Sequence, residues 1–482
     1  GTWSIDLATA TPVTGSLSLN ANGTNTVSAT ATDAAGNVSS AGTQTLTIDT
    51  TAPNAPAVTS AALTNSASPT IAGTAEAGST VTVTVGGATY TTTATGGSWS
   101  IDLATASPIA GSLSLNANGA NPISATATDA AGNVSAPGTQ SLTIDTTAPN
   151  APAVTSAALT KSVTPTVSGT AEANSTVTLT VGGATYTATA AAGTGAWSVD
   201  LSTATPASGT LSLNANGTNA VSVTARDAAG NVSAAGTQSL TIDTTAPNAP
   251  VVTSAALTSS ATPVIAGTAE ADSTVTVTVG GATYTTAASG TGAWSVDLST
   301  ATPTSGTLSL NANGTNPVSA TATDAAGNTS SAGTQSLTVD TTAPNAPAVT
   351  SAALTNSTTP VIGGTAEAGS TVTVTVGGAT YTTTATGGSW SIDLATATPI
   401  AGSLSLNANG ANPISATATD AAGNVSAPGT QALTIDTTLP NAPAVTSAAL
   451  TNSTTPTIGG TAEAGSTVTV TIGGATYTTT AT

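Results

Sequence analysis

The sequence predicts an all-β protein made of tandem copies of one antiparallel β-sandwich. The five tryptophans stand at positions 3, 99, 197, 294 and 390, so successive ones are 96, 98, 97 and 96 residues apart, and the five tyrosines keep the same intervals. Each interval contains short stretches in which aliphatic residues alternate with Thr or Ser, the pattern of a half-buried strand. A period of about 97 residues exceeds that of solenoids and suits a domain that folds by itself.

Seven strands are expected in each copy. In the second copy they are residues 57–64, 70–75, 79–85, 88–94, the stretch holding Trp99, Ile101 and Leu103, residues 123–127 and residues 139–144. Gly86 and Gly87 join the third and fourth strands in a two-residue hairpin, and the sequence DAAGN turns the sixth strand. Trp99 is expected to point into the core. Seven short strands in about 97 residues indicate an antiparallel sandwich, to which residues 113–115 add a further short strand.

The copies are nearly identical. Residues 76–149 and 367–440 differ at three positions, which indicates recent duplication and not separately evolved active sites. We expect complete repeats at 50–145, 146–243, 244–340 and 341–436, with the C-terminal part of a repeat at 1–49 and the N-terminal part of one at 437–482. Because the chain begins within the pattern and contains no methionine, we expect it to belong to a longer protein.

The composition excludes most catalytic chemistry. The 482 residues include 21 Asp or Glu and 2 Lys or Arg, a net charge of −19, which argues against binding nucleic acid. The absence of Cys and His removes thiolate and imidazole metal sites, disulfides and Ser-His-Asp catalysis. One Trp and one Tyr per copy are too few for a sugar-binding cleft, and no apolar run is long enough to enter a membrane. We therefore expect a non-enzymatic protein.

Three motifs carry a family resemblance. TIDTTAPNAPAV at 47–58, GTAEAGSTVTVTV at 73–85 and SATATDAAGNVS at 124–135, repeated in order, resemble the bacterial immunoglobulin-like repeats of giant cell-surface adhesins. The resemblance implies seven-stranded immunoglobulin-like β-sandwiches arranged as an extended rod. It also implies export by type I secretion, an extracellular place on the bacterial surface, a part in cell adhesion or biofilm formation, and calcium ions that stiffen the junctions.

The junctions are expected to be short and stiff. Pro53 and Pro56 fix their own backbone angles and push the residues before them toward extended geometry. Each copy carries four acidic residues at fixed places, and an up-and-down strand path brings Asp49, Glu76 and Asp129 to one end of the sandwich. Carboxylates about 5 Å apart repel by about 3 kcal/mol per pair at an effective dielectric near 20. Ca²⁺, which takes six to eight oxygen ligands, would relieve this repulsion, with turn carbonyls and Asn133 completing its shell.

The predicted calcium ligands occupy these places in every copy. They are Asp33, Asp49, Glu76, Asp129, Asp145, Glu172, Asp227, Asp243, Glu270, Asp324, Asp340, Glu367, Asp420, Asp436 and Glu463.

Each acid also has a plain structural interpretation. Asp129 and Asn133 are residue types that organise turns by hydrogen bonds to the backbone, while Glu76 and Asp49 suit solvated charges. Asp102 points outward and better suits protection of the sheet against pairing with neighbours.

Two further positions have specific expectations. After Glu76 and its equivalents stand Gly78, Asn174, Asp272, Gly369 and Gly465, residue types that tolerate left-handed backbone geometry. Arg226 replaces a threonine beside Asp227, so we expect the junction of Asp145, Glu172 and Asp227 to bind calcium more weakly.

Two functions remain open from the sequence. One is a calcium-stiffened stalk that projects an adhesive region. The other is a self-assembling extracellular filament or surface layer, in which repeats associate laterally or head to tail. The outward row of Thr80, Thr82 and Thr84 also suggests ice binding, but a twisted sheet is a poor flat lattice and ordinary strand filling explains the row.

Overall fold

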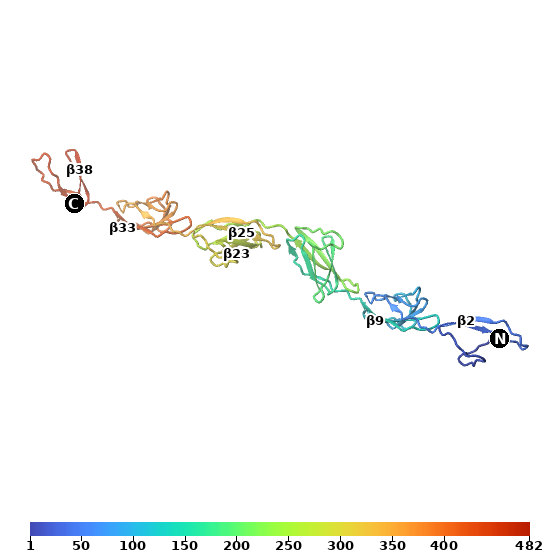
Figure 1. The fold of residues 1–482 in the computed structure, drawn as a ribbon. Coiled ribbons are helices and arrows are strands. Elements are labelled where there is room, and N and C mark those ends of the chain that lie inside the picture. The colour runs from blue at the N-terminus through green and yellow to red at the C-terminus, as the bar shows by residue number, and fades with distance from the viewer. The chain divides into compact units, whose positions relative to one another are not determined.

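The computed structural model describes residues 1–482, and the chain divides into two units, residues 1–245 and 246–482. Every regular element is a β-strand. The structure therefore has no long apolar helix that could cross a membrane. Each unit contains two complete sandwiches and one partial one. The long strand of the sandwich recurs along the chain as β9, β25 and β33 in Figure 1.

The first complete sandwich shows the plan of all four. Its strands are β3 (Ala57–Val58), β4 (Leu63–Thr64), β5 (Thr70–Thr74), β6 (Thr80–Val85), β7 (Ala88–Thr93), β8 (Ser98–Asp102), β9 (Asn118–Thr128) and β10 (Gly138–Asp145). They form a three-stranded sheet, β3-β5-β8, and a five-stranded sheet, β4-β10-β9-β6-β7. All pairs are antiparallel except β4 and β10, which run parallel. The tandem all-β sandwich architecture predicted from the sequence is confirmed.

The other complete sandwiches repeat this plan strand for strand. The second, in the same unit, has β11 (Ala153–Val154), β12 (Leu159–Thr160), β13 (Thr166–Thr170), β14 (Thr176–Val181), β15 (Ala184–Thr189), β16 (Ala196–Asp200), β17 (Gly217–Arg226) and β18 (Gly236–Ile242). The third has β19 (Val251–Val252), β20 (Leu257–Thr258), β21 (Val264–Thr268), β22 (Thr274–Val279), β23 (Ala282–Ala287), β24 (Ala293–Asp297), β25 (Asn313–Thr323) and β26 (Gly333–Asp340). The fourth has β27 (Ala348–Val349), β28 (Leu354–Thr355), β29 (Val361–Thr365), β30 (Thr371–Val376), β31 (Ala379–Thr384), β32 (Ser389–Asp393), β33 (Asn409–Thr419) and β34 (Gly429–Asp436).

The expected first strand, residues 57–64, is two strands in different sheets. β3 pairs with β5, whereas β4 crosses to pair with β10. The crossing occurs where the amides of Thr59 and Ser60 both donate to the carbonyl of Ala72, at 2.8 and 3.1 Å, which ends the regular pairing. Gln140 Nε2 then holds the carbonyl of Ser60 at 2.9 Å. Each sandwich therefore has eight strands where seven were expected.

The extra strand expected at residues 113–115 does not form. Leu113 and Leu115 instead pack against the core, and the amide of Ser114 donates to the carbonyl of Gly86 at 2.8 Å. The segment thus closes over the β6–β7 hairpin. That hairpin forms as predicted, with φ of +55° at Gly86 and +78° at Gly87, the left-handed geometry of a type I′ turn.

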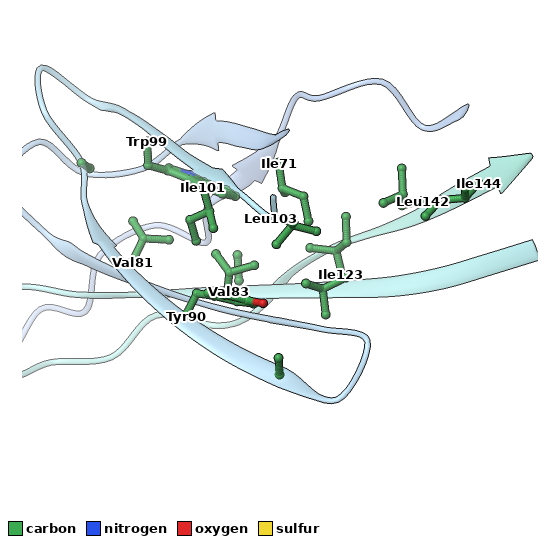
Figure 2. Packing of buried hydrophobic residues seen from close by; sticks show 14 residues of the cluster. Ile71, Val81, Val83, Tyr90, Trp99, Ile101, Leu103, Ile123, Leu142 and Ile144 are labelled. Atoms are coloured by element: carbon green, nitrogen blue, oxygen red, sulfur yellow. The ribbon is translucent and has the colours of Figure 1, made fainter. Parts of the chain in front are cut away.

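The core lies between the two sheets of each sandwich. In Figure 2, Trp99 and Ile101 of β8 and Ile71 of β5 belong to one sheet, and Val83 and Tyr90 belong to the other. Trp99 is buried, as predicted. The strict alternation of β6 places its valines inside and its threonines on the outer face.

The partial sandwiches contain fewer strands. Residues 1–49 form β1 (Gly23–Ala29) and β2 (Gly42–Ile48) in the first unit. Residues 437–482 form β35 (Ala444–Val445), β36 (Gly460–Thr461), β37 (Thr467–Ile472) and β38 (Ala475–Thr480) in the second.

Candidate functional site: the joints between repeats

Each joint begins with a loop that an aspartate organises. We call residues 129–133, with their equivalents at 33–37, 227–231, 324–328 and 420–424, the DAAGN loops. Oδ1 of Asp129 accepts the backbone amides of Ala131 and Asn133 at 2.8 and 2.9 Å, and Oδ2 accepts Nδ2 of Asn133 at 2.8 Å. The bond from the Asn133 side chain, supported by those from the backbone, lowers the pKa of Asp129 below its ordinary value of 3.8. The carboxylate is therefore ionised and fixed at neutral pH.

The asparagine that closes the loop also reaches the preceding repeat. Asn133 Nδ2 donates to the backbone carbonyl of Asp49 at 3.0 Å. The same bond joins Asn231 to Asp145, and Asn424 to Asp340, each at 2.8 Å. The loop at one end of a sandwich thus contacts the last strand of the sandwich before it.

The linker between sandwiches is held at its first residues. Asn118 Oδ1 accepts the amide of Thr146 at 2.9 Å and the hydroxyls of Thr146 and Thr147 at 3.1 and 3.2 Å. Asp145 Oδ1 accepts the amide of Thr147 at 2.9 Å. The Asp145 carboxylate therefore shapes the start of the linker, and so do its equivalents Asp49, Asp340 and Asp436.

The prolines of the linker are buried against the sandwich that follows. Pro53 and Pro56 are both buried, and the carbonyl of Pro56 passes so close to Gly138 that a Cβ there would lie 1.7 Å from the oxygen. Only glycine permits this approach of β10 to the linker. The linker is thus anchored at its two prolines, while the residues between them are exposed, and this anchoring supports the stiffness expected from the prolines.

The glutamates lie in the turn after the second expected strand. Glu76 is exposed, and its backbone carbonyl accepts the amide and hydroxyl of Ser79 at 3.1 and 2.7 Å. Glu172 borders a shallow hollow that Asn150 and Ala151 of its own linker also line, and Glu270 has the equivalent place beside Asn248 and Ala249. This turn therefore lies at the end of the sandwich where the chain enters, as the expected strand path requires.

The structure brings the expected ligands together only in part. The Asp49 carbonyl and the Asp129 carboxylate converge on one atom, Asn133 Nδ2, but no three acidic side chains gather closely enough to hold a metal ion. Oxygens of this kind, a carbonyl and a carboxylate, are those that Ca²⁺ prefers. They are engaged here in hydrogen bonds, so calcium coordination stays a prediction. The same loop bonds recur at Asp33, Asp227, Asp324 and Asp420, and the same glutamate turn recurs at Glu172, Glu270, Glu367 and Glu463.

Asp102 organises a different turn. Its Oδ1 accepts the amide of Ala104 at 3.0 Å, and its Oδ2 accepts the hydroxyl of Thr105 at 3.1 Å. At Asp200 the side-chain hydroxyl of Ser202 provides the largest of the bonds that lower the pKa of the carboxyl. Asp102, which is exposed, therefore ends strand β8 by capping the turn that follows it, and Asp200 does the same at the end of β16.

The turn after each glutamate and the Arg226 side chain are each the subject of a prediction. Asn174 and Asp272 have φ of 65° and 61°, and Gly78 has 85°, so the left-handed geometry predicted for this turn is present. Arg226 Nε donates to the carbonyl of Gly230 at 3.4 Å, which places the guanidinium over the DAAGN loop that holds Asp227. A weaker calcium affinity at this joint stays a prediction.

Sequence reasoning missed the asparagines that hold the linker. The sequence LNANG recurs in all five copies, at 19–23, 115–119, 213–217, 310–314 and 406–410. Its second asparagine binds the linker, as Asn118 does, and its first is bonded by a buried asparagine, Asn121. The unchanged recurrence of LNANG in all five copies was the available signal. The spacing of these asparagines did not indicate which group each amide would bind.

The sequence places these sandwiches in a known family. The bacterial Ig-like domain family matches residues 57–146, 152–244, 251–341 and 348–437. The chain belongs to this family. No curated relative matches it.

Several solved structures are similar to the chain. A tetra-tandem repeat from the extending region of a large adhesion protein is 22% identical, covers 80% of this chain and all of its own, and has a TM-score of 0.27. A Ca²⁺-stabilized adhesin that helps an Antarctic bacterium reach out and bind ice is 33% identical, with 80% and 99% covered and a TM-score of 0.26. A bacterial ice-binding adhesin is 28% identical, with 56% and 90% covered and a TM-score of 0.26. At these TM-scores the likeness does not by itself assign a role to this chain.

Proposed function

We propose that these bacterial Ig-like domains form part of the stalk of a large bacterial cell-surface adhesin. In this role the chain is an extracellular, non-enzymatic spacer that projects an adhesive region for cell adhesion or biofilm formation. The observation that carries the proposal is the joint, where a packed linker and a bond from the next repeat connect successive copies of one sandwich. A series of identical domains whose joints cannot bend freely keeps an extended form, which is what a stalk requires.

The surface of the repeats supports a passive role. The sandwiches contain no histidine or cysteine, and the hydroxyl-rich outer faces of their sheets carry few charges. The acidic side chains are used to organise turns, as at Asp102 and Asp129. Chain length and repetition are then the properties on which the proposed function depends.

Calcium at the joints is the finer part of this proposal. Asp49, Glu76 and Asp129 are expected at the end of the sandwich where the chain enters, and a chain with a net charge of −19 has few cationic side chains to balance them. A modest movement of the Asn133 amide would free the Asp49 carbonyl and the Asp129 carboxylate for a cation. We expect the joints at Asp49, Asp145 and Asp340 each to bind Ca²⁺, most weakly where Arg226 lies over the loop.

Small-angle scattering of the full chain tests the stalk. At about 40 Å per sandwich, from strands of about seven to nine residues plus loops, five repeat lengths reach about 200 Å. We expect a maximum dimension near this value in calcium and a profile closer to that of a flexible chain after chelation. A compact particle would contradict the stalk. A profile that chelation leaves unchanged would contradict calcium stiffening and leave the stalk intact.

The self-assembling filament or surface layer makes a different prediction. A stalk segment stays at constant mass as its concentration rises, whereas lateral or head-to-tail association increases the scattering mass. Light scattering over a concentration series, with and without calcium, distinguishes the two functions. Growth under either condition would favour the assembling protein.

A further inference from the structure

We infer that the asparagine closing the DAAGN loop at three of the joints is a latch that restrains the joint between repeats without any bound ion. It is a positioning residue, and the inference deepens the proposed stalk function and rests on it for its purpose. The latch residues are Asn133, Asn231 and Asn424.

The latch connects two bodies through one amide group. Asn231 Nδ2 donates to Asp227 Oδ2 at 2.7 Å within its own loop and to the Asp145 carbonyl of the preceding sandwich at 2.8 Å. An amide nitrogen has two hydrogens, so both bonds form together. The side chain thereby fixes the position of one sandwich's loop against the last strand of the other.

Both ends of the latch are held before it closes. On the loop side, Asp227 Oδ1 accepts the amides of Gly230 and Asn231 at 2.7 and 2.8 Å, which fixes the backbone that carries the asparagine. On the other side, Asp145 and Asn118 hold the amides of Thr147 and Thr146 at 2.9 Å, which fixes the linker beside the accepting carbonyl. Little further conformational entropy is lost when such prearranged groups bind.

The loop that carries the latch also lies close to a second part of the preceding sandwich. At the joint after residue 145, a Cβ on Gly230 would lie 3.4 Å from Asn65 Nδ2, so the loop of one sandwich passes close to a turn of the previous one. In the second unit, the equivalent Gly423 lies near Ser259, with a Cβ-to-Oγ distance of 3.7 Å. This proximity leaves little room for the loop to rotate about the hydrogen bond.

The absence of cysteine from the chain allows a direct test. Thr91 and Thr187 are exposed on β7 and β15, on either side of this joint. The double variant T91C/T187C of the full chain, spin-labelled, reports the distance distribution across the joint by pulsed electron paramagnetic resonance. The measurement is made in chelator and then with CaCl₂ added.

Two substitutions distinguish loss of the latch from loss of the fold. In chelator we expect a narrow distribution of label-to-label distances for the parent double-cysteine chain. The same chain with Asn231→Ala should give a broad distribution. The matched control, Asn133→Ala, removes the identical side chain from the neighbouring loop and should leave this joint narrow. The amide protection of residues 146–243, measured by hydrogen exchange, shows whether the sandwich carrying Asn231→Ala stays folded.

Each outcome decides between the two restraints. A narrow distribution for Asn231→Ala in chelator overturns the latch, and so does a broad one for the parent chain. If instead the latch holds and CaCl₂ narrows the distance distribution of Asn231→Ala, the latch stands and calcium restrains the same joint beside it. If the parent chain is broad in chelator and narrow in CaCl₂, calcium stiffening stands and the latch fails.

Discussion

The complete sandwich at 50–145 and the partial one at 1–49 have almost the same sequence over their shared part but bury it differently. Trp99 and Ile101 are 3% and 5% exposed, whereas the equivalent Trp3 and Ile5 are 71% and 64% exposed. In the second unit, Tyr381 of the complete fourth sandwich is 2% exposed and the equivalent Tyr477 is 61% exposed. The alternating pattern selects which face turns inward, but only the opposing sheet makes that face a core.

The largest test of this comparison removes the tryptophan from each region. Trp99→Ala should destabilise its sandwich by about 3–5 kcal/mol, because it leaves a cavity between the sheets. Within these 482 residues no opposing sheet covers Trp3, so in this chain Trp3→Ala should change local stability by less than about 0.5 kcal/mol. Hydrogen exchange resolved by peptide measures each region separately within the full chain. Equal losses of protection at the two sites would contradict the comparison.

The hairpin glycines provide a smaller contrast. Gly86 and Gly473 have φ of +55° and +60°, so an alanine at either costs about 1 kcal/mol in backbone strain. At Gly86 the added Cβ would also meet Leu115 Cδ2 at 2.8 Å, whereas nothing lies within 4 Å at Gly473. We expect Gly86→Ala to cost about 2–3 kcal/mol in total. Matching losses of hydrogen-exchange protection in the two hairpins would show that residues 113–115 do not press on this turn.

A buried amide gives a third contrast. Asn121 is 4% exposed and donates to the carbonyls of Asn116 and Gly119 at 3.0 and 3.1 Å. Asn25 makes the same bonds in the partial sandwich, where water can replace it. We expect Asn121→Ala to cost about 1.5 kcal/mol and Asn25→Ala clearly less, because only the first leaves buried groups unpaired. The measurement is again local hydrogen exchange, and the expectation fails if Asn25→Ala proves the more costly substitution.

The smallest difference between the complete and the partial sandwich is expected in the pKa of the aspartate that organises the DAAGN loop, because this loop is formed in both. Bonds from Asn133 and Asn37 lower the pKa of Asp129 and Asp33, each below the ordinary value of 3.8. A lowered folded-state pKa stabilises the loop at pH above the unfolded value, and this contribution is lost as the pH falls through the lowered pKa. Carboxyl carbon titration by NMR should place both midpoints below 3.8. An ordinary midpoint at Asp33 would show that its loop depends on a complete sandwich.

The sequence was most informative where one local rule decides the structure. The alternation of residues 80–85 fixed the inward face, and Gly86-Gly87 fixed the turn. The left-handed geometry at Asn174 and Asp272 also followed from residue type. The division of residues 57–64 between two sheets could not be predicted, because it depends on bonds to Ala72 in the next strand and to Gln140, which lies 80 residues from Ser60.

The joints could be predicted only in outline. The strand path predicted that the glutamate turn and the DAAGN loop share one end of the sandwich, but it could not supply side-chain partners. The Asn133 amide, whose oxygen is expected to complete a calcium shell, also donates from its nitrogen to two oxygens, a role that the spacing did not indicate. Counting acidic residues predicts how much charge must be balanced, whereas the hydrogen-bond donors that balance part of it are visible only in three dimensions.

The parallel pairing of β4 with β10 has a mechanical consequence. These strands lie near the two ends of each repeat, with Leu63 opposite Thr143 and Thr64 opposite Ile144. Tension applied through the linkers on either side pulls the two strands along their own length in opposite directions. Their hydrogen bonds are then loaded in shear and must break together, instead of opening one after another like a zipper. A sandwich connected in this way resists stretching through the β4–β10 pairing itself.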